Sequence, residues 1–393
     1  MRSGFHRRAV LASAAIALLV AGCSAGAASP ATTAPPSTSE APVTATAEAT
    51  TTTRALSDAV SGVAAQIEDL IREGRFSGVV LVADGPDIVW QVANGVADRE
   101  LGTLIAMDTR FNLGSMPKMF TAVAVVQLIE DGELALDGTI AEYLPDYPNQ
   151  EVADQVTIEQ LLTHTSGMGD AFIGDFNDDP HRYRSDADYL PLFVDEPLEF
   201  TPGDRFSYSN AGYVVLGLII AEVSGVGYEE YLRSRVFEPA GMADTGDYDI
   251  EADLSDLAIG YTTRDEDGNE TGVLAANTPL MPGRGFAAGG GYSTAGDLLR
   301  FSTALLDHRL LSPASVDLLL TGRVPVSESA SYALGFFDRV QGGVRVVGHG
   351  GGAPGVCSSL SIYPDTGFTA IVLSNTDDDC RAVLDLWQES PPR

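Results

Sequence analysis

The sequence predicts an α/β (α+β) fold of two lobes, in which helices flank an antiparallel sheet and a mostly helical lobe is inserted into the chain. Short β-rich runs stand near both ends of the region after residue 54, and helical patterns fill its middle. This region has about 340 residues, which is more than one ordinary domain. We therefore expect residues 55–393 to form an α/β lobe at about 55–114 and 285–393 and a helical lobe at about 115–284.

The first 22 residues predict an export signal of the lipoprotein type. A basic start is followed by an apolar stretch at 9–21, which is shorter than the about 20 residues that a membrane-spanning helix needs. Residues 19–23 read Leu-Val-Ala-Gly-Cys and resemble the lipobox of bacterial lipoproteins. This resemblance implies that Cys23 is lipidated and becomes the mature N-terminus. A plain secretory signal with an accidental cysteine is the alternative.

Residues 23–54 predict a disordered tether, because Ala, Thr, Pro and Ser dominate and aromatic residues are absent. A diacyl anchor at Cys23 would attach the tether to the extracytoplasmic face of a bacterial cell membrane. The formal net charge is −32, and removing the signal with its three arginines lowers it to −35. Such an acidic chain repels nucleic acid, which is therefore not an expected partner.

The first elements of the folded region follow in order. Residues 56–72 place apolar side chains on one face of a helix. Residues 78–83 and 88–92 are β-rich runs around Asp-Gly-Pro-Asp, which predicts a hairpin. Ser115 is a favoured N-cap and Pro117 would fall in the first turn, so we expect a helix from Ser115 to about residue 130.

The later pattern is helical first and β-rich afterwards. Thr157 and Gln160 have the spacing of a capping box. Helices are expected at about 211–223, 228–237, 295–307, 313–320 and 379–388. Strands are expected at about 332–338, 343–349, 358–363 and 368–374.

Cys357 and Cys380 are the cysteines that remain after Cys23. They flank the hairpin expected from the last two strands, so they fall near the same end of it. An even pair in an exported chain predicts a disulfide, with two unpaired buried thiols as the alternative. The five histidines are scattered and form no cluster of metal-ligand spacing with these cysteines, so we expect neither a metal nor another cofactor.

Lys118 is the only lysine in the chain, and it stands three residues after Ser115. The other 22 basic residues are arginines. A guanidinium cannot give up its proton in a protein, whereas the pKa of a buried ammonium shifts readily. A neutral amine one helical turn from a hydroxyl can take its proton and create a nucleophile. By itself the pair is also compatible with a capping serine and a solvated lysine.

Tyr208 and Asn210 form a second cluster with Ser209, just before an apolar helix. A tyrosine beside a cation loses or shares its phenolic proton more easily, so Tyr208 could relay protons between the serine, the leaving group and water. Asn210 offers an amide that could hold Lys118 and a substrate carbonyl. Taken alone, the two residues are better explained as a packed ring and a helix cap.

The sequence Gly-His-Gly-Gly-Gly at 348–352 closes an expected strand. Glycines there would let a substrate backbone approach, and a backbone N–H could pair with that of Ser115 as an oxyanion hole. The α/β-hydrolases carry a similar glycine-rich loop before their nucleophile, whereas this one follows Ser115. A Gly-x-Ser-x-Gly elbow is also missing, so that class is excluded.

A serine with lysine at the third position after it, then Tyr-x-Asn, then a late histidine with glycines, resembles the serine β-lactamase and penicillin-binding protein superfamily. The likeness is to its class C β-lactamase-like branch, which includes cephalosporinases, D-alanyl-D-alanine carboxypeptidases, D-aminopeptidases and esterases. It extends over most of 57–388 and includes Leu-Leu-Thr-His-Thr-Ser-Gly at 161–167 and Gly-Gly-Gly-Tyr-Ser-Thr at 289–294. The family fold is the two-lobe arrangement expected above.

The resemblance implies a role for each matching residue. Ser115 would be the acylated nucleophile, Lys118 its activating partner and Tyr208 the proton shuttle. Substrate binding would involve Asn210, His349, Gly351 and Gly352, and the backbone N–H groups of Ser115 and Gly352 would form the oxyanion hole. His164 belongs to a family hallmark, and we expect its role to be structural.

One position departs from the family pattern. The third motif usually has Lys or His, then Thr or Ser, then Gly, but Gly350 occupies the hydroxyl position here. That hydroxyl helps to bind the carboxylate of β-lactams and of D-Ala-D-Ala. We therefore expect a serine hydrolase of an ester or amide, ranked as an esterase, then a peptidoglycan D-peptidase, then a β-lactamase. The alternative is a non-catalytic, cell-wall-binding lipoprotein, which a damaged Ser-Lys-Tyr set would indicate.

Overall fold

The computed structural model describes residues 58–174, 176–252, 256–265, 268–377 and 379–392. The expected signal, Cys23 and the tether lie outside these residues. Among the described residues, eight strands form one antiparallel sheet in the order β2-β1-β14-β13-β12-β11-β10-β9. The strands are β1 (Gly78–Asp84), β2 (Asp87–Asn94), β9 (Val324–Ser327), β10 (Ala330–Tyr332), β11 (Phe337–Gln341), β12 (Val344–Ala353), β13 (Val356–Tyr363) and β14 (Phe368–Ser374).

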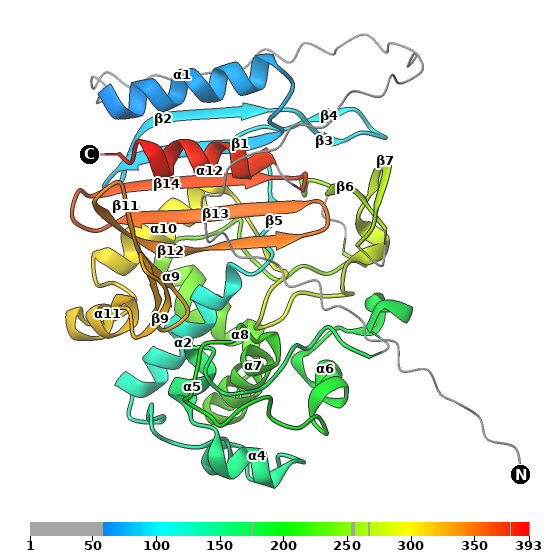
Figure 1. Cartoon of the computed structure of the whole chain (residues 1–393), viewed down its shortest axis with the longest axis vertical. Helices are drawn as coiled ribbons and strands as arrows, with labels where there is room; N and C mark the ends of the chain where they lie inside the picture. The colour runs from blue at the N-terminus through cyan, green and yellow to red at the C-terminus, as the bar shows by residue number, and fades with distance from the viewer. Residues whose placement is uncertain (1–57, 175, 253–255, 266–267, 378, 393) are drawn as a thin grey trace, which may run out of the picture.

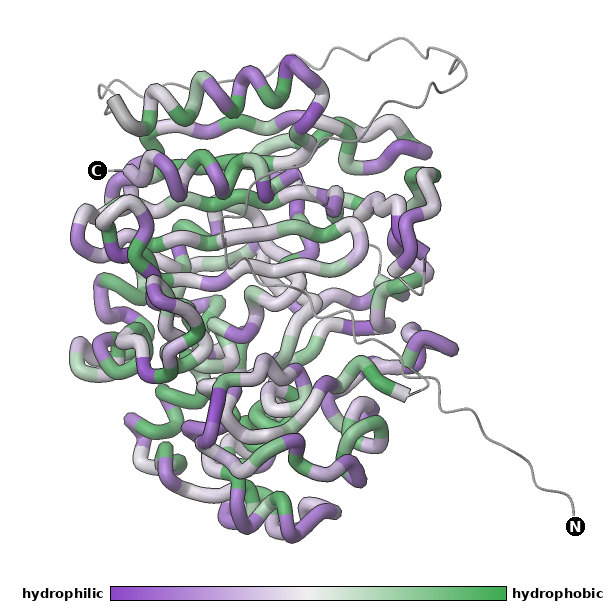
Figure 2. Tube along the Cα trace, in the orientation of Figure 1, coloured by the Kyte–Doolittle hydropathy of each residue, from purple (hydrophilic) through white to green (hydrophobic). Residues whose placement is uncertain are grey.

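Two helices from opposite ends of the chain cover one face of this sheet (Figure 1). They are α1 (Asp58–Arg72) and α12 (Asp379–Glu389). Apolar side chains of α1 such as Val63 pack with Val80 of β1 and Trp387 of α12 in a shared cluster. Along α1 hydrophilic and hydrophobic residues alternate, because only one side of the helix faces the sheet (Figure 2).

The other face of the sheet packs against the remainder of the chain. Alternate residues of β1, such as Leu81, belong to a large cluster that includes Phe301 of α10 (Ala295–Leu306) and Phe120 of α2 (Pro117–Glu130). The helical lobe is built around α7 (Asn210–Ser224). Most side chains of this helix are buried. Other helices are α3 (Ile140–Tyr143), α4 (Gln150–Gln155), α5 (Ile158–Leu162), α6 (Asp186–Phe193), α8 (Tyr228–Leu232), α9 (Glu238–Ala240) and α11 (Pro313–Leu320).

The expected class, an antiparallel sheet flanked by helices with a mostly helical insertion, is confirmed. The expected hairpin is β1–β2, and Thr157 and Gln160 form the predicted capping box. Cys357 and Cys380 are joined in the predicted disulfide, with their Cα atoms 5.8 Å apart. This bond ties the start of β13 to α12. Within the described ranges, no single helix is both long and apolar enough to cross a membrane.

Four details differ from the sequence predictions. The strand expected at about 332–338 is divided between the end of β10 and the start of β11. Ser115 is not the N-cap of α2, which begins at Pro117 with Met116 as its cap. Instead, the Lys118 N–H donates to the Ser115 carbonyl at 3.2 Å in a tight turn that leads into the helix. The expected region of helices and loops also contains a hairpin of β6 (Tyr261–Arg264) and β7 (Glu270–Ala276). The helix expected at 228–237 changes to a π-helical turn at Arg233–Phe237.

Candidate active site

Ser115 lies where three backbone segments meet. The Gly114 carbonyl accepts a hydrogen bond from the Gly290 N–H at 2.9 Å, and the Leu113 carbonyl accepts one from Ser358 Oγ at 2.8 Å. Gly114 has a φ of 54°, and a Cβ on it would stand 2.7 Å from the Gly352 nitrogen. A side chain at this position would therefore push β12 away from the nucleophile.

Gly351 is constrained in the same way from the facing strand. A Cβ on Gly351 would stand 1.9 Å from the Leu113 carbonyl oxygen, a distance that no side chain can adopt. The glycines of the third motif thus bring the β12 backbone against the turn that carries Ser115. This approach puts the Gly352 nitrogen beside Gly114, the residue just before Ser115.

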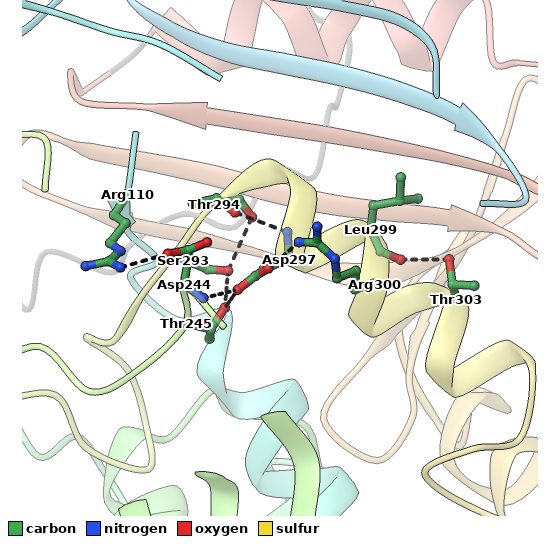
Figure 3. Close-up of polar contacts among 9 residues, drawn as sticks. All are labelled: Arg110, Asp244, Thr245, Ser293, Thr294, Asp297, Leu299, Arg300 and Thr303. Carbon is green, nitrogen blue, oxygen red and sulfur yellow. Dashed lines mark hydrogen bonds and ion pairs between the residues drawn. The ribbon is translucent and has the colours of Figure 1, made fainter. Parts of the chain in front are cut away.

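The glycine-rich segment at 289–294 is fixed by a buried carboxylate. Asp297, in the first turn of α10, accepts hydrogen bonds from the Asp244 N–H at 2.7 Å and from Thr245 Oγ1 at 2.8 Å (Figure 3). Thr245 Oγ1 also lies 2.7 Å from Ser293 Oγ, and Arg300 pairs with Asp297 at 2.6 Å. This polar network anchors the far end of the segment that contacts Gly114.

Lys118 is fully buried in the first turn of α2. Its Nζ donates to Asn210 Oδ1 at 2.8 Å and to the Ala288 carbonyl, and it lies 3.4 Å from Ser115 Oγ. Burial lowers the pKa of Lys118 to about 7, and the nearby charge of Asp170 only partly opposes this shift. A substantial neutral fraction therefore stands beside the Ser115 hydroxyl at neutral pH.

Tyr208 closes the other side of the serine. Its ring lies under Lys118 Nζ, 4.8 Å from the nitrogen, and its hydroxyl oxygen is buried although the residue as a whole is partly exposed. The Ser115 hydroxyl faces this phenol and lowers its pKa, but the pair does not reach the geometry of a formed hydrogen bond. Burial outweighs this contribution and raises the pKa of Tyr208.

The expectation that Tyr208 loses its proton more easily is therefore wrong for the resting site. The phenol stays protonated because its buried anion would lack solvation, and Lys118 does not compensate for that loss. Tyr208 can still pass a proton on when charge develops near it. The more readily neutralised group beside Ser115 is Lys118.

Asn210 links the lysine to an acidic residue that sequence reasoning missed. Its Oδ1 accepts from Lys118, and its Nδ2 donates to Asp170 Oδ1 at 2.9 Å. These two bonds fix the orientation of the amide. Asp170 is exposed and follows the Thr-His-Thr-Ser-Gly hallmark by three residues, but nothing in its own sequence context predicts a contact with Asn210.

The third-motif histidine is buried rather than open to solvent. The side chain of His349 is 1% exposed, and its nitrogens lie beside the Gly350 carbonyl and, at 3.1 Å, Tyr332 Oη. Burial, together with the charge of Lys118, lowers the pKa of His349 to about 3. The ring is therefore neutral at physiological pH, so the third motif carries neither a charged histidine nor a hydroxyl.

The geometry agrees with comparisons to known proteins. The Beta-lactamase family model matches residues 63–388. The chain belongs to the β-lactamase family of serine hydrolases, in its class C-like branch. It is 32% identical to penicillin-binding protein 4* of Bacillus subtilis, covering 79% of this chain and 71% of that protein. It is also 32% identical to esterase EstB of Burkholderia gladioli, over 61% of this chain and 68% of the esterase.

Solved structures give the same assignment. A penicillin-binding protein of Bacillus halodurans matches with a TM-score of 0.73 and 34% identity, over 81% of this chain and 98% of that one. The D-amino acid amidase of Ochrobactrum anthropi SV3, complexed with L-phenylalanine amide, matches with a TM-score of 0.72 and 26% identity, over 85% and 97%. These relatives share a fold but differ in their named activities.

The lowered pKa of Lys118 predicts a pH-dependent rate. Because the amine must be neutral to accept the Ser115 proton, kcat/KM for an uncharged ester should rise as the pH increases through about 7 and then level off. Lys118→Arg should lose about 100-fold or more, as should Lys118→Ala, because a guanidinium accepts no proton. Initial rates between pH 5 and 9 test this. Wild-type rates in Lys118→Arg would contradict it.

The two buried histidines predict acid-sensitive stability. The pKa of His164 is lowered well below its usual value, mainly by burial, and that of His349 falls to about 3. The unfolded chain therefore binds more protons below pH 6.5, and each histidine should cost about 1.4 kcal/mol of stability per pH unit there. Urea unfolding between pH 6.5 and 4 measures this slope. His349→Gln should reduce the slope, and an unchanged slope would refute the assignment.

Proposed function

We propose that the protein hydrolyses an ester or amide through an acyl-enzyme on Ser115. The observation that carries this proposal is the buried Lys118 amine, whose pKa is lowered to about 7 beside the serine hydroxyl. Tyr208 and Asn210 complete the catalytic set that Ser115 and Lys118 begin. A non-catalytic, wall-binding lipoprotein would not need a buried amine beside a serine hydroxyl. The named activities of the relatives support acyl transfer without fixing the substrate.

Acylation begins when Ser115 Oγ attacks the substrate carbonyl carbon and its proton moves to neutral Lys118 Nζ. The carbonyl oxygen becomes an oxyanion, which the backbone N–H groups of Ser115 and Gly352 stabilise. The tetrahedral intermediate collapses, the bond to the leaving group breaks, and Tyr208 passes a proton to that group while Lys118 resupplies it. Water then attacks the acyl carbonyl and gives one proton to the Lys118–Tyr208 pair. As the bond between Ser115 Oγ and the acyl carbon breaks, the pair returns that proton to Ser115 Oγ, and the carboxylic acid leaves.

The charges around the site favour acyl donors that carry no carboxylate near the scissile bond. His349 is neutral, and Gly350 has no hydroxyl to hold a carboxylate. Asp170 adds a negative charge that attracts an ammonium group instead. We therefore rank simple esters and amino-acid amides or esters with a free amino group above D-Ala-D-Ala peptides and β-lactams.

One cation near His349 could reverse this ranking by binding a substrate carboxylate: Arg339 on β11. Its guanidinium lies over the Phe337 ring, 4.1 Å from the centroid, and its charge reaches His349. Burial lowers the pKa of Arg339 to about 10, which still leaves it charged at neutral pH. If it bound substrate carboxylates, anionic donors would be preferred, so the experiment includes an Arg339→Met arm.

The test offers the full chain four donors: a short-chain ester, a D-amino acid amide, a D-Ala-D-Ala peptide and a chromogenic cephalosporin. The first two should turn over fastest, and a mass increase equal to the acyl group should map to Ser115. Ser115→Ala should abolish both signals, and Asp170→Asn should slow the amide more than the ester. Turnover that survives in Ser115→Ala overturns the mechanism. A preference for carboxylate donors that Arg339→Met removes overturns the ranking.

We also propose that the protein is exported and anchored in the membrane by a lipid on Cys23. The basic start, short apolar stretch and lipobox-like sequence support this proposal. Cells fed a radiolabelled fatty acid should label the wild-type chain, and detergent should be needed to extract it. Cys23→Ala should remain unlabelled. Label that persists in Cys23→Ala, or a wild-type chain that takes up none, would contradict the anchor.

A further inference from the structure

Three buried side chains connect the Tyr208 turn to the third-motif strand by hydrogen bonds. The Ser209 N–H donates to His164 Nδ1 at 3.0 Å, and His164 Nε2 lies 3.1 Å from Tyr332 Oη. Tyr332 Oη also lies 3.1 Å from His349 Nε2, and His349 Nδ1 contacts the Gly350 carbonyl. His164 and Tyr332 are fully buried, and His349 is almost so.

The two ends of this connection fix where its protons lie. A backbone N–H can only donate, so His164 Nδ1 is bare and its Nε2 carries a hydrogen. That Nε2–H donates to Tyr332 Oη. The Tyr332 O–H has two neighbours that can accept, His349 Nε2 at 3.1 Å and Tyr213 Oη, and we assign it to His349 Nε2, because Nε2 is bare and has no other donor. His349 then carries its hydrogen on Nδ1 and donates to the Gly350 carbonyl, which can only accept. Every group is neutral, and every donor has an acceptor.

The backbone of His164 supports a dedicated role for this residue. His164 has a φ of 56°, in the left-handed region that costs a side-chain-bearing residue free energy. Its carbonyl also accepts from the Ser207 N–H at 2.8 Å. His164 therefore holds the chain on both sides of Tyr208, through Ser207 and Ser209.

We infer that His164 and Tyr332 are positioning residues that fix the proton location and orientation of His349 and tie the Tyr208–Asn210 turn to β12. They touch neither Ser115 nor the reacting atoms and act through the residues that they hold. The effect on turnover rests on the proposed acyl transfer, whereas the proton arrangement exists in the resting protein and can be observed without a substrate.

The surroundings keep the connection neutral. Two basic side chains face it: Lys118 from α2, whose charged form disfavours a proton on either histidine, and Arg339 from β11, which disfavours one on His349. The phenols of Tyr208 and Tyr213 also pack against the His164 ring. Protonating either histidine would turn an acceptor nitrogen into a donor that points at another donor, so acid should break the connection at that bond.

The test is 15N NMR of the full chain labelled at histidine. The wild type should show one buried ring protonated only on Nε2, which is His164, and another protonated only on Nδ1, which is His349. Tyr332→Phe removes the hydroxyl but keeps the ring, so the bare His349 Nε2 should lose its hydrogen bond and its 15N signal should shift, and kcat should fall about tenfold, with a smaller change in KM. Tyr363→Phe is the control, because its buried hydroxyl has no hydrogen-bond partner in the described chain, and it should change neither reading.

A second variant separates the two ends of the connection. Asparagine tolerates the left-handed backbone, and its amide oxygen can accept from the Ser209 N–H, but it is too short to reach Tyr332. His164→Asn should therefore keep His349 protonated on Nδ1 while lowering kcat less than Tyr332→Phe.

A wild-type His349 that is protonated on Nε2 or on both nitrogens would overturn the inference, as would an unchanged His349 signal in Tyr332→Phe. Turnover that survives in Ser115→Ala, with both histidine signals as expected, would overturn the proposed reaction and leave this inference standing.

Discussion

The buried amine of Lys118 is the constraint on which the rest of this site depends. Removing an ammonium from water is costly, and here hydrogen bonds to Asn210 and to the Ala288 carbonyl offset only part of that cost, so the pKa falls to about 7. The Asp170 carboxylate does not bond to Lys118 directly. The Asn210 amide lies between them and bonds to both. The result is an amine that is neither firmly protonated nor freely solvated, and that is the state a general base for Ser115 requires.

Close contacts between backbone segments place Ser115 beside this amine. The Leu113–Gly114 backbone lies between the glycines of the segment at 289–291 and those of β12, so Ser115 is positioned by main-chain contacts rather than by side-chain packing. Strands from the end of the chain, a turn from its first third and a loop anchored by Asp297 meet at this point. Glycine is needed at Gly351, where a Cβ would collide with the Leu113 carbonyl oxygen, and at Gly114, where a Cβ would collide with the Gly352 nitrogen.

Much of this arrangement could be predicted from the sequence, because the residues that determine it lie close together in the chain. The period-two strands, the β1–β2 turn, the capping box at Thr157 and the paired cysteines each lie within short stretches of chain. The catalytic candidates were found because a single lysine beside a serine is unusual in an arginine-rich chain. The N-cap assignment of Ser115 failed because propensity favoured a cap where tertiary contacts impose a separate turn.

The remaining features depend on contacts that are distant in the chain. Tyr332 is 168 residues from His164, and no pattern in one sequence joins them. The pKa of Tyr208 was expected to fall because a cation lay near it, yet it rises because its hydroxyl is buried. The hydrogen bond that joins Asp170 to the site is made by Asn210, 40 residues later in the chain. Burial and long-range pairing decide the electrostatics, and both arise only after folding.

The lone lysine also makes the central claim directly measurable. Labelling the protein with 15N-lysine places the side-chain signal on Lys118 alone, because the chain contains no other lysine. Following that signal between pH 5 and 11 should reveal a titration near pH 7 in the resting protein. A Lys118 that remains protonated up to pH 10 would contradict the proposal that this amine accepts the Ser115 proton.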